Sequence, residues 1–114
     1  MDVKRGEIYY ANLGGMGAGS EQSGNRPVLI VQNNVGNRFS PTVIVACMTT
    51  RVFKNAIPTH VRLEKTNYNI AEDSLILCEQ IKTFDKSRLL AHIATLSPAD
   101  QFRVDAALRL SLGL

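Results

Sequence analysis

Short apolar runs divided by turn residues occupy the first two-thirds of the chain, a pattern typical of β-strands. Two runs, Pro27–Gln32 and Thr42–Met48, are rich in β-branched residues and bounded by Gly, Asn or Pro, which favours buried central strands. Apolar and polar residues alternate in Thr59–Leu63, as in a half-buried strand. The other predicted strands are Glu7–Leu13, Ser74–Ile81 and Leu89–Thr95. Five or six short strands predict a mainly β protein with some α structure (α+β), built as a small barrel or a strongly curved sheet.

The C-terminal segment predicts one helix. Ser97 can cap it, Pro98 takes the first helical position and Asp100 the third, where a carboxylate favours the helix dipole. The apolar residues of this segment fall on two faces, one with Val104, Leu108 and Leu112 and the other with Phe102, Ala106 and Leu110. We expect one face to cover the barrel. The other face requires a second surface, which favours a homodimer.

Length and composition indicate one globular domain over residues 1–114. The chain has 114 residues, of which 45% are hydrophobic and 20% charged, an ordinary composition for a folded protein. No apolar run approaches the roughly 20 residues that span a bilayer, and the N-terminal MDVKRGEIYY lacks the apolar core of a signal peptide. We therefore expect a cytoplasmic protein without a membrane partner. Cys47 and Cys78 lie in apolar stretches and are expected to be buried free thiols.

Positive charge is concentrated in the first half of the chain. The net charge is only +3, yet no acidic residue occurs between Gln22 and Leu63. That stretch contains a set of basic residues, Arg26, Arg38, Arg51, Lys54 and Arg62. A polyanion would prefer such a surface because each neutralised phosphate releases counterions. Chance clustering would give the same pattern, so charge alone does not identify the partner.

Several kinds of chemistry lack their motif in this sequence. There is no GxxxxGK[ST] phosphate loop, no dinucleotide fingerprint, no GxSxG elbow and no Cys/His spacing for a metal, so we expect neither a cofactor nor a metal site. A pair of histidines can act as acid and base in RNA cleavage. His60 and His92 both fall within predicted strands, however, where a histidine is more often structural.

A polar cluster at predicted strand ends is the remaining candidate site. Arg26 stands just before a buried strand and is anchored by Pro27, while Thr49 and Thr50 follow the apolar run TVIVACM. An arginine and a threonine at adjacent strand ends can bind one phosphate, the guanidinium through paired donors and the hydroxyl through one. A surface arginine beside a strand-ending threonine is the alternative interpretation, and spacing alone favours it.

The whole chain resembles a known family in the order of its motifs. The segment GSEQSGNRPVLIVQN at residues 19–33 is similar to the signature of the MazF/PemK toxins, ribonucleases of bacterial toxin–antitoxin pairs. The match continues through KRGEIYYANL, NRFSPTVIVACMTT, PTHV and DSLILCEQIKTFDKSRL, and is closest to the Gram-positive form. The resemblance implies an SH3-like barrel of the CcdB/PemK type with a C-terminal helix. It also implies homodimerisation, metal-independent cleavage of single-stranded RNA, and inhibition by a MazE-like antitoxin.

The resemblance also implies a mechanism and residues for it. The ribose 2′-hydroxyl attacks the adjacent phosphate and leaves a 2′,3′-cyclic phosphate and a free 5′-hydroxyl. Arg26 matches the family's catalytic arginine and Thr49 its catalytic threonine. Because a guanidinium hardly deprotonates, we expect Arg26 to stabilise the phosphorane and contact the leaving oxygen, while Thr49 donates to a non-bridging oxygen. Glu21 is the candidate base, and pairing with Arg26 in the free enzyme is the alternative role for it.

Base recognition is expected to use polar side chains at the rim of the barrel, mainly by hydrogen bonding because aromatic residues are few. The candidates are amides, carboxylates and hydroxyls at predicted strand or loop ends: Ser20, Gln22, Asn33, Asn34, Thr50, Glu79 and Gln80. The acid-free stretch attracts carboxylates as readily as phosphates, so the antitoxin is expected to cover the same rim with an acidic tail.

Two other classes of protein share such a barrel. Gyrase-binding toxins of the CcdB type are not enzymes and need a C-terminal tryptophan, whereas this chain has no Trp and ends Leu112-Gly113-Leu114. A non-catalytic nucleic-acid-binding barrel remains a further alternative, because the polar rim suits it equally well.

Overall fold

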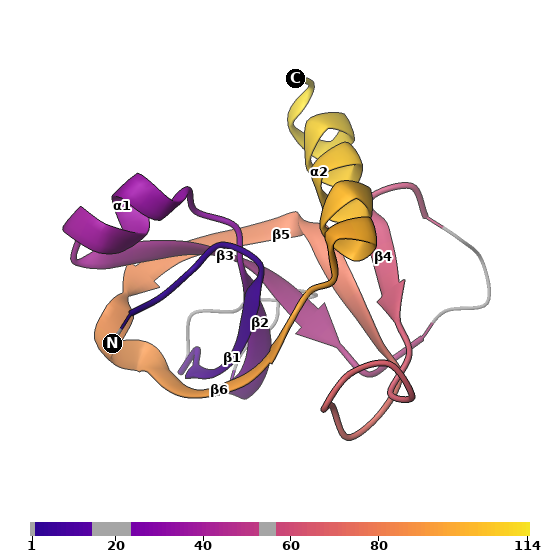
Figure 1. Cartoon of the computed structure of the whole chain (residues 1–114), viewed down its shortest axis with the longest axis horizontal. Helices are drawn as coiled ribbons and strands as arrows, with labels where there is room; N and C mark the ends of the chain where they lie inside the picture. The colour runs from indigo at the N-terminus through magenta and orange to yellow at the C-terminus, as the bar shows by residue number, and fades with distance from the viewer. Residues whose placement is uncertain (1, 15–23, 53–56) are drawn as a thin grey trace.

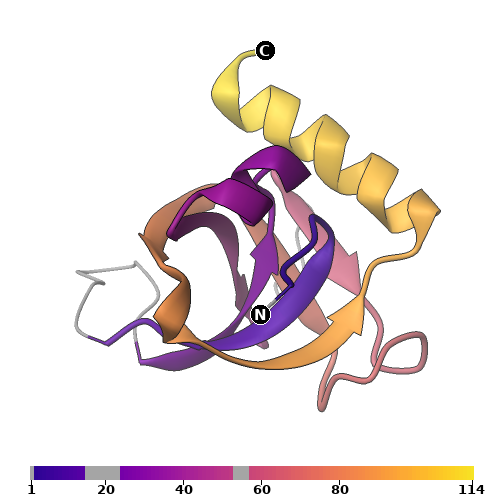
Figure 2. The ribbon, with the colours of Figure 1, turned by 60° about the vertical axis from the view of Figure 1, so that its left-hand side comes forward.

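The computed structural model describes residues 2–14, 24–52 and 57–114. In chain order the elements are β1 (Glu7–Asn12), β2 (Asn25–Ile30), α1 (Asn34–Phe39), β3 (Thr42–Thr49), β4 (His60–Leu63), β5 (Ser74–Asp85), the 3-10 turn η1 (Lys86–Arg88), β6 (Leu89–Thr95) and α2 (Pro98–Leu112). The strands curve round a common interior, and α2 lies across the outside of the sheet (Figures 1 and 2). The predicted fold class, a mainly β barrel-like sheet with a C-terminal helix, is confirmed.

The strands form one antiparallel sheet in the order β4-β5-β3-β2-β1-β6. The central strands β3 and β2 are the two apolar runs that the sequence assigned to the interior. The long strand β5 pairs with β3 over most of its length and with β4 at its start. A register shift between Ala46 and Cys47 leaves the middle of β5 bulged, and such a bulge bends the sheet.

Alternation of side chains along each strand builds two separate apolar clusters, one on each face of the sheet. On β1, for example, Ile8 belongs to one cluster and Tyr9 to the other. The first cluster includes Leu29, Met48 and Ile76 and is closed by Val104 and Leu108 of α2. The second fills the inside of the curve.

Helix α2 begins and ends where its sequence predicts. Ser97 accepts a hydrogen bond from the Asp100 N–H as the N-cap, and Gly113 ends the helix in the left-handed conformation with φ of 73°. Val104 and Leu108 are buried as expected, and Leu112, although 56% exposed, lines the same hollow as Leu108, Ile44 and Ile81. Phe102 and Leu110, on the second face, are 73% and 59% exposed.

The short helix α1 was not predicted. Its sequence NVGNRF includes a glycine and no apolar stripe, so local propensity does not favour a helix. Side-chain hydrogen bonds hold it instead. Asn37 Nδ2 donates to the Gln32 carbonyl at 2.9 Å, and Gln32 Nε2 donates to Asn37 Oδ1 at 3.1 Å. Lys86 Nζ also donates to the carbonyl of Asn37.

Both cysteines are buried and neither forms a disulfide, as predicted. Burial, with a contribution from the charge of Glu79, raises the pKa of the Cys78 thiol to about 12, so the thiolate is scarce at neutral pH. In the described part of the chain, no helix is long and apolar enough to cross a membrane.

Candidate active site

The start of β2 carries Arg26 to the open end of the sheet. On one side β2 pairs with β1, where Ala11 lies opposite Arg26 and Tyr10 opposite Pro27. On the other side Val28 lies opposite Cys47 of β3. Continuing this register by two residues along each strand sets Arg26 opposite Thr49. The β2–β3 pairing itself ends at Val28 and Cys47, so the arginine and threonine that the sequence singled out lie just beyond it on neighbouring strands.

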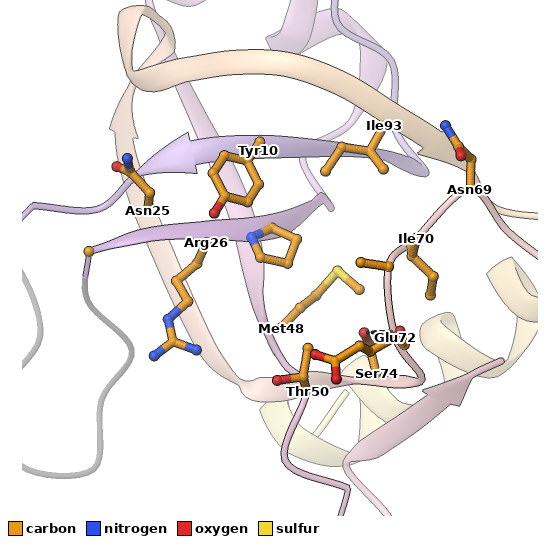
Figure 3. A pocket seen from close by; sticks show the side chains of 13 residues that line it. Tyr10, Asn25, Arg26, Met48, Thr50, Asn69, Ile70, Glu72, Ser74 and Ile93 are labelled. Carbon is orange, nitrogen blue, oxygen red and sulfur yellow. Dashed lines mark hydrogen bonds between the residues drawn. The ribbon is translucent and has the colours of Figure 1, made fainter. Parts of the chain in front are cut away.

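A cavity of about 650 Å³ opens beside Arg26. Tyr10, Pro27, Met48, Ile70 and Ile93 give it apolar walls. Figure 3 shows Met48 between Arg26 and the loop that carries Ile70, with Tyr10 and Ile93 along another side of the cavity. The remaining lining residues are mostly polar or small: Gly24, Asn25, Arg26, Thr50, Asn69, Ala71, Glu72 and Ser74. An apolar hollow rimmed by a few polar groups suits a flat ligand with polar edges.

The two predicted threonines have different surroundings. Thr50 is exposed and lines the cavity. Thr49 is 3% exposed, and its Oγ1 accepts a hydrogen bond from the Arg51 N–H at 3.1 Å. Because a hydroxyl also carries one donor proton, Thr49 can still donate to a phosphate oxygen that approaches the strand end.

The loop between β4 and β5 forms one wall of the cavity and is tied to α2. The Tyr68 hydroxyl donates to Asp100 Oδ2 at 2.5 Å and accepts from the Ser97 N–H at 3.0 Å. Partial burial of the Asp100 carboxyl acts to raise its pKa, but the hydrogen bonds from Tyr68 and Arg103 together outweigh this effect. The pKa of Asp100 therefore lies below its usual value.

A second hollow of about 410 Å³ adjoins the first. It shares Thr50 and Glu72 with the first cavity, and its other lining residues are Val52, Arg62, Lys65 and Asp73. The Lys65 N–H donates to Asp73 Oδ1 at 2.9 Å, and this bond, helped by the nearby Arg62, lowers the pKa of the Asp73 carboxyl. The rim thus continues from Arg26 past Thr50 to Lys65 and to Arg62, which is ion-paired with Glu64 and Asp73.

Asn33 and Asn34 were expected at the end of a strand, and this expectation was wrong. Strand β2 ends at Ile30, and Asn33 is the N-cap of α1, where its side chain accepts from the Gly36 N–H. Asn34 Oδ1 accepts from the Arg5 N–H at 2.7 Å. Neither asparagine lines the cavity that contains Arg26.

Glu79 and Gln80 also do not end a strand, because β5 continues to Asp85. Both lie in its bulged middle, outside the lining of the two hollows. Glu79 is exposed, and its carboxylate contacts His60 Nε2 at 2.8 Å and accepts from Thr59 Oγ1 at 3.3 Å. Their proposed role in binding RNA stays a prediction.

Ser20, Glu21 and Gln22 lie outside the described residues, so the predicted base and its neighbours remain expectations from the sequence. The two histidines stand on the outermost strands in the sheet order, His60 on β4 and His92 on β6. His92 contacts Glu7 at 3.6 Å and packs against Tyr9. Neither histidine lines the cavity beside Arg26.

Sequence reasoning missed Glu72 and the apolar walls of the cavity. Met48 and Ile93 lie in predicted strands, where an apolar residue is expected to be buried in the core. Ile70 lies in a turn-rich segment that has no hydrophobic periodicity. No pattern in the sequence marks these residues as neighbours of Arg26. Among the residues that the structure describes, no group of three or more His, Cys, Asp or Glu side chains is placed to hold a metal ion.

The model of the family of PemK-like, MazF-like toxins of type II toxin-antitoxin systems matches residues 4–112. The chain belongs to the PemK/MazF toxin family. Among solved structures, it is 28% identical to a mycobacterial endoribonuclease in complex with its cognate antitoxin. That match has a TM-score of 0.79 and covers 98% of this chain and 96% of the other. A second mycobacterial endoribonuclease is 26% identical, with a TM-score of 0.79 and coverage of 100% and 94%.

MazF from Deinococcus radiodurans has the same fold, with a TM-score of 0.81 at 22% identity and coverage of 100% of this chain and 99% of that chain. The expected SH3-like barrel of the PemK type is thereby confirmed. The match extends over nearly the full length of each of these toxins, so the strands that bear Arg26 and Thr49 belong to the shared fold.

Proposed function

We propose that this PemK/MazF-family chain is an endoribonuclease toxin that cleaves single-stranded RNA without a metal ion. The observation that carries the proposal is the placement of Arg26 and Thr50 in one cavity, with Thr49 at the adjacent strand end. The names of the mycobacterial relatives as endoribonucleases support it.

Internal transesterification accounts for the chemistry that these residues can perform. The ribose 2′-hydroxyl attacks the adjacent phosphate, the bond to the 5′-oxygen breaks, and the products carry a 2′,3′-cyclic phosphate and a 5′-hydroxyl. The Arg26 guanidinium stabilises the charge on the phosphorane and donates to the leaving oxygen, while Thr49 donates to a non-bridging oxygen. Glu21 is the candidate for removing the 2′-hydroxyl proton.

The cavity beside Arg26 offers space for an unpaired base. Its apolar walls from Met48, Ile70 and Ile93 can cover the faces of a base, and Thr50 and Ser74 add hydroxyls at its edge. Hydrophobic contact therefore contributes more to RNA binding than the sequence suggested. The sequence did not reveal these walls because they are assembled from segments that are distant in the chain. Gln22, Ser20, Glu79 and Gln80 stay candidates for contacts further along the strand.

A homodimer and a MazE-like antitoxin complete the proposal. Phe102, Leu110 and Leu112 of α2 are exposed and together form an apolar surface. An exposed apolar patch of this kind is typical of a protein–protein interface. A groove beside this helix is lined by further apolar residues, Val31, Ile44, Ile81, Leu108 and Leu114. A second copy of the chain would cover this surface. The antitoxin would bind the basic rim in the cytoplasm and exclude RNA.

The test is incubation of the purified protein with a long RNA in excess EDTA, beside an Arg26→Ala variant. The proposal expects discrete cleavage by the wild-type protein and at least ~100-fold slower cleavage by the variant. A wild-type protein that binds RNA without cutting it would refute the enzymatic proposal and favour a non-catalytic binder.

A further inference from the structure

Glu72 stands in the wall between the two hollows of the site. Together with Thr50 it lines both the apolar cavity beside Arg26 and the polar hollow that contains Arg62 and Lys65. Figure 3 draws Glu72 close to Thr50 and Ser74, across the cavity from Tyr10. A ligand that extends from the first hollow to the second must therefore pass this carboxylate.

The carboxylate of Glu72 is unusual among the acidic side chains of the described residues. Each of the others is hydrogen-bonded or ion-paired: Asp2, Glu7, Glu64, Asp73, Glu79, Asp85, Asp100 and Asp105. Within residues 2–14, 24–52 and 57–114, the Glu72 side chain has no such partner, and only its backbone carbonyl accepts, from Ser74 Oγ. Among these residues, no group occupies the acceptor oxygens of this carboxylate.

The charge of Glu72 restricts what that ligand presents to it. Phosphate oxygens are repelled by a carboxylate, so the backbone of the RNA must run past the cations and not face Glu72. A carboxylate only accepts hydrogen bonds. A base that lies between the apolar walls would turn its polar edge toward Glu72, and that edge must supply donors.

The four bases differ in the donors they offer. Adenine and cytosine carry an exocyclic amino group, and guanine carries one beside its ring N–H. Uracil has a single ring N–H flanked by two carbonyl oxygens, which a carboxylate repels. We propose that Glu72 is a specificity-determining residue that selects, at the nucleotide in the cavity beside Arg26, a base with an exocyclic amino group over uracil. This inference rests on the proposed cleavage of RNA.

A test uses short RNAs with one cleavage site, with each of the four bases placed in turn at every position flanking the scissile bond. The wild-type protein, Glu72→Gln and the control Asp2→Asn are compared at equal salt. Asp2 is paired with Lys4 and lies outside both hollows, so the control removes one negative charge without touching the site. The readout is kcat/KM for each RNA.

At one position the wild-type protein is expected to favour amino-bearing bases over uracil. Glu72→Gln should reduce that preference about tenfold, since one base contact discriminates by ~1–3 kcal/mol, and should raise the rate on the uracil RNA because an amide also donates. Asp2→Asn should leave the preference unchanged. Equal changes for all four bases would overturn the inference and indicate a general electrostatic or proton-transfer role. If Glu72→Gln leaves the base preference unchanged, the role of Glu72 is overturned while the proposed cleavage of RNA stands. If the wild-type protein does not cleave RNA, the proposed function is overturned as well.

Discussion

The Tyr68 hydroxyl donates a hydrogen bond to the Asp100 carboxylate at 2.5 Å and so joins the loop before β5 to the first turn of α2. The two residues are 32 positions apart in the chain. Because the same loop supplies Asn69, Ile70 and Glu72 to the cavity, this bond holds one wall of the candidate active site. The C-terminal helix thus positions the site as well as covering the core.

This relationship predicts a pH-dependent stability. The folded state lowers the pKa of Asp100, so the stabilisation is complete above the pKa of the unfolded chain, near 3.9, and is lost as the pH falls through the lower folded value. Asp100→Asn should reduce the free energy of unfolding by about 1–2 kcal/mol at pH 7 and by less at pH 2. Urea unfolding at both pH values measures this. An equal loss at pH 2 would show that the charge is not the cause.

Replacement of Arg26 separates charge from geometry. Arg26→Ala should slow cleavage by at least ~100-fold with little change in the melting temperature, because a transition-state donor is lost at a half-buried strand end. Arg26→Lys should recover only part of the rate, since an ammonium lacks the planar fork. Arg38→Ala is the control: it removes a cation from α1 outside the cavity and should leave kcat unchanged. A lysine variant as fast as the wild type would contradict the paired-donor role.

The neighbouring threonines distinguish a buried donor from an exposed one. Thr49→Ala should reduce cleavage about 10–100-fold, less than Arg26→Ala, because a neutral donor contributes less than a charged one. Thr50→Ala should act mainly on KM, because Thr50 lines the cavity without facing Arg26 across the strands. Single-turnover rates at saturating RNA make the comparison. A larger loss of rate for Thr50→Ala would assign the phosphate donor to Thr50.

The exposed face of α2 predicts the oligomeric state. Phe102→Glu or Leu110→Glu should convert a homodimer to a monomer with impaired cleavage, because a buried carboxylate without a partner is costly. Val35→Glu, at a residue of α1 that is 71% exposed, is the matched control and should leave the dimer intact. Sedimentation at micromolar concentration gives the masses. A fully active wild-type monomer would contradict the dimer.

The sequence predicted the strands well because each has a strong local signature. Leu89–Thr95 agrees with β6 residue for residue, and the helix after Ser97 has both its cap and its proline. The errors occur where tertiary contacts decide. Helix α1 depends on the Gln32–Asn37 bonds, and β5 extends beyond Ile81 because β3 pairs with it on both sides of a bulge.

The candidate site was predictable only in part. Arg26 and Thr49 stand beside apolar runs, and the pairing of those runs makes their strands neighbours in the sheet. Glu72 and the walls formed by Ile70 and Ile93 come from segments that meet Arg26 only through the curvature of the sheet. Asn33 and Asn34 have a structural role in α1 instead. Asn33 caps the start of the helix, and Asn34 Oδ1 accepts a hydrogen bond from Asn37 Nδ2.

The chemical nature of the RNA ends tests the central claim most directly. An RNA cut in EDTA should yield a 5′-hydroxyl, which a polynucleotide kinase labels without prior dephosphorylation, and a 2′,3′-cyclic phosphate visible by ³¹P NMR. An RNA with a 2′-deoxy sugar at the scissile position should remain uncut. A 5′-phosphate on the product, or cleavage of the deoxy-substituted RNA, would contradict attack by the 2′-hydroxyl and the roles assigned to Arg26 and Thr49.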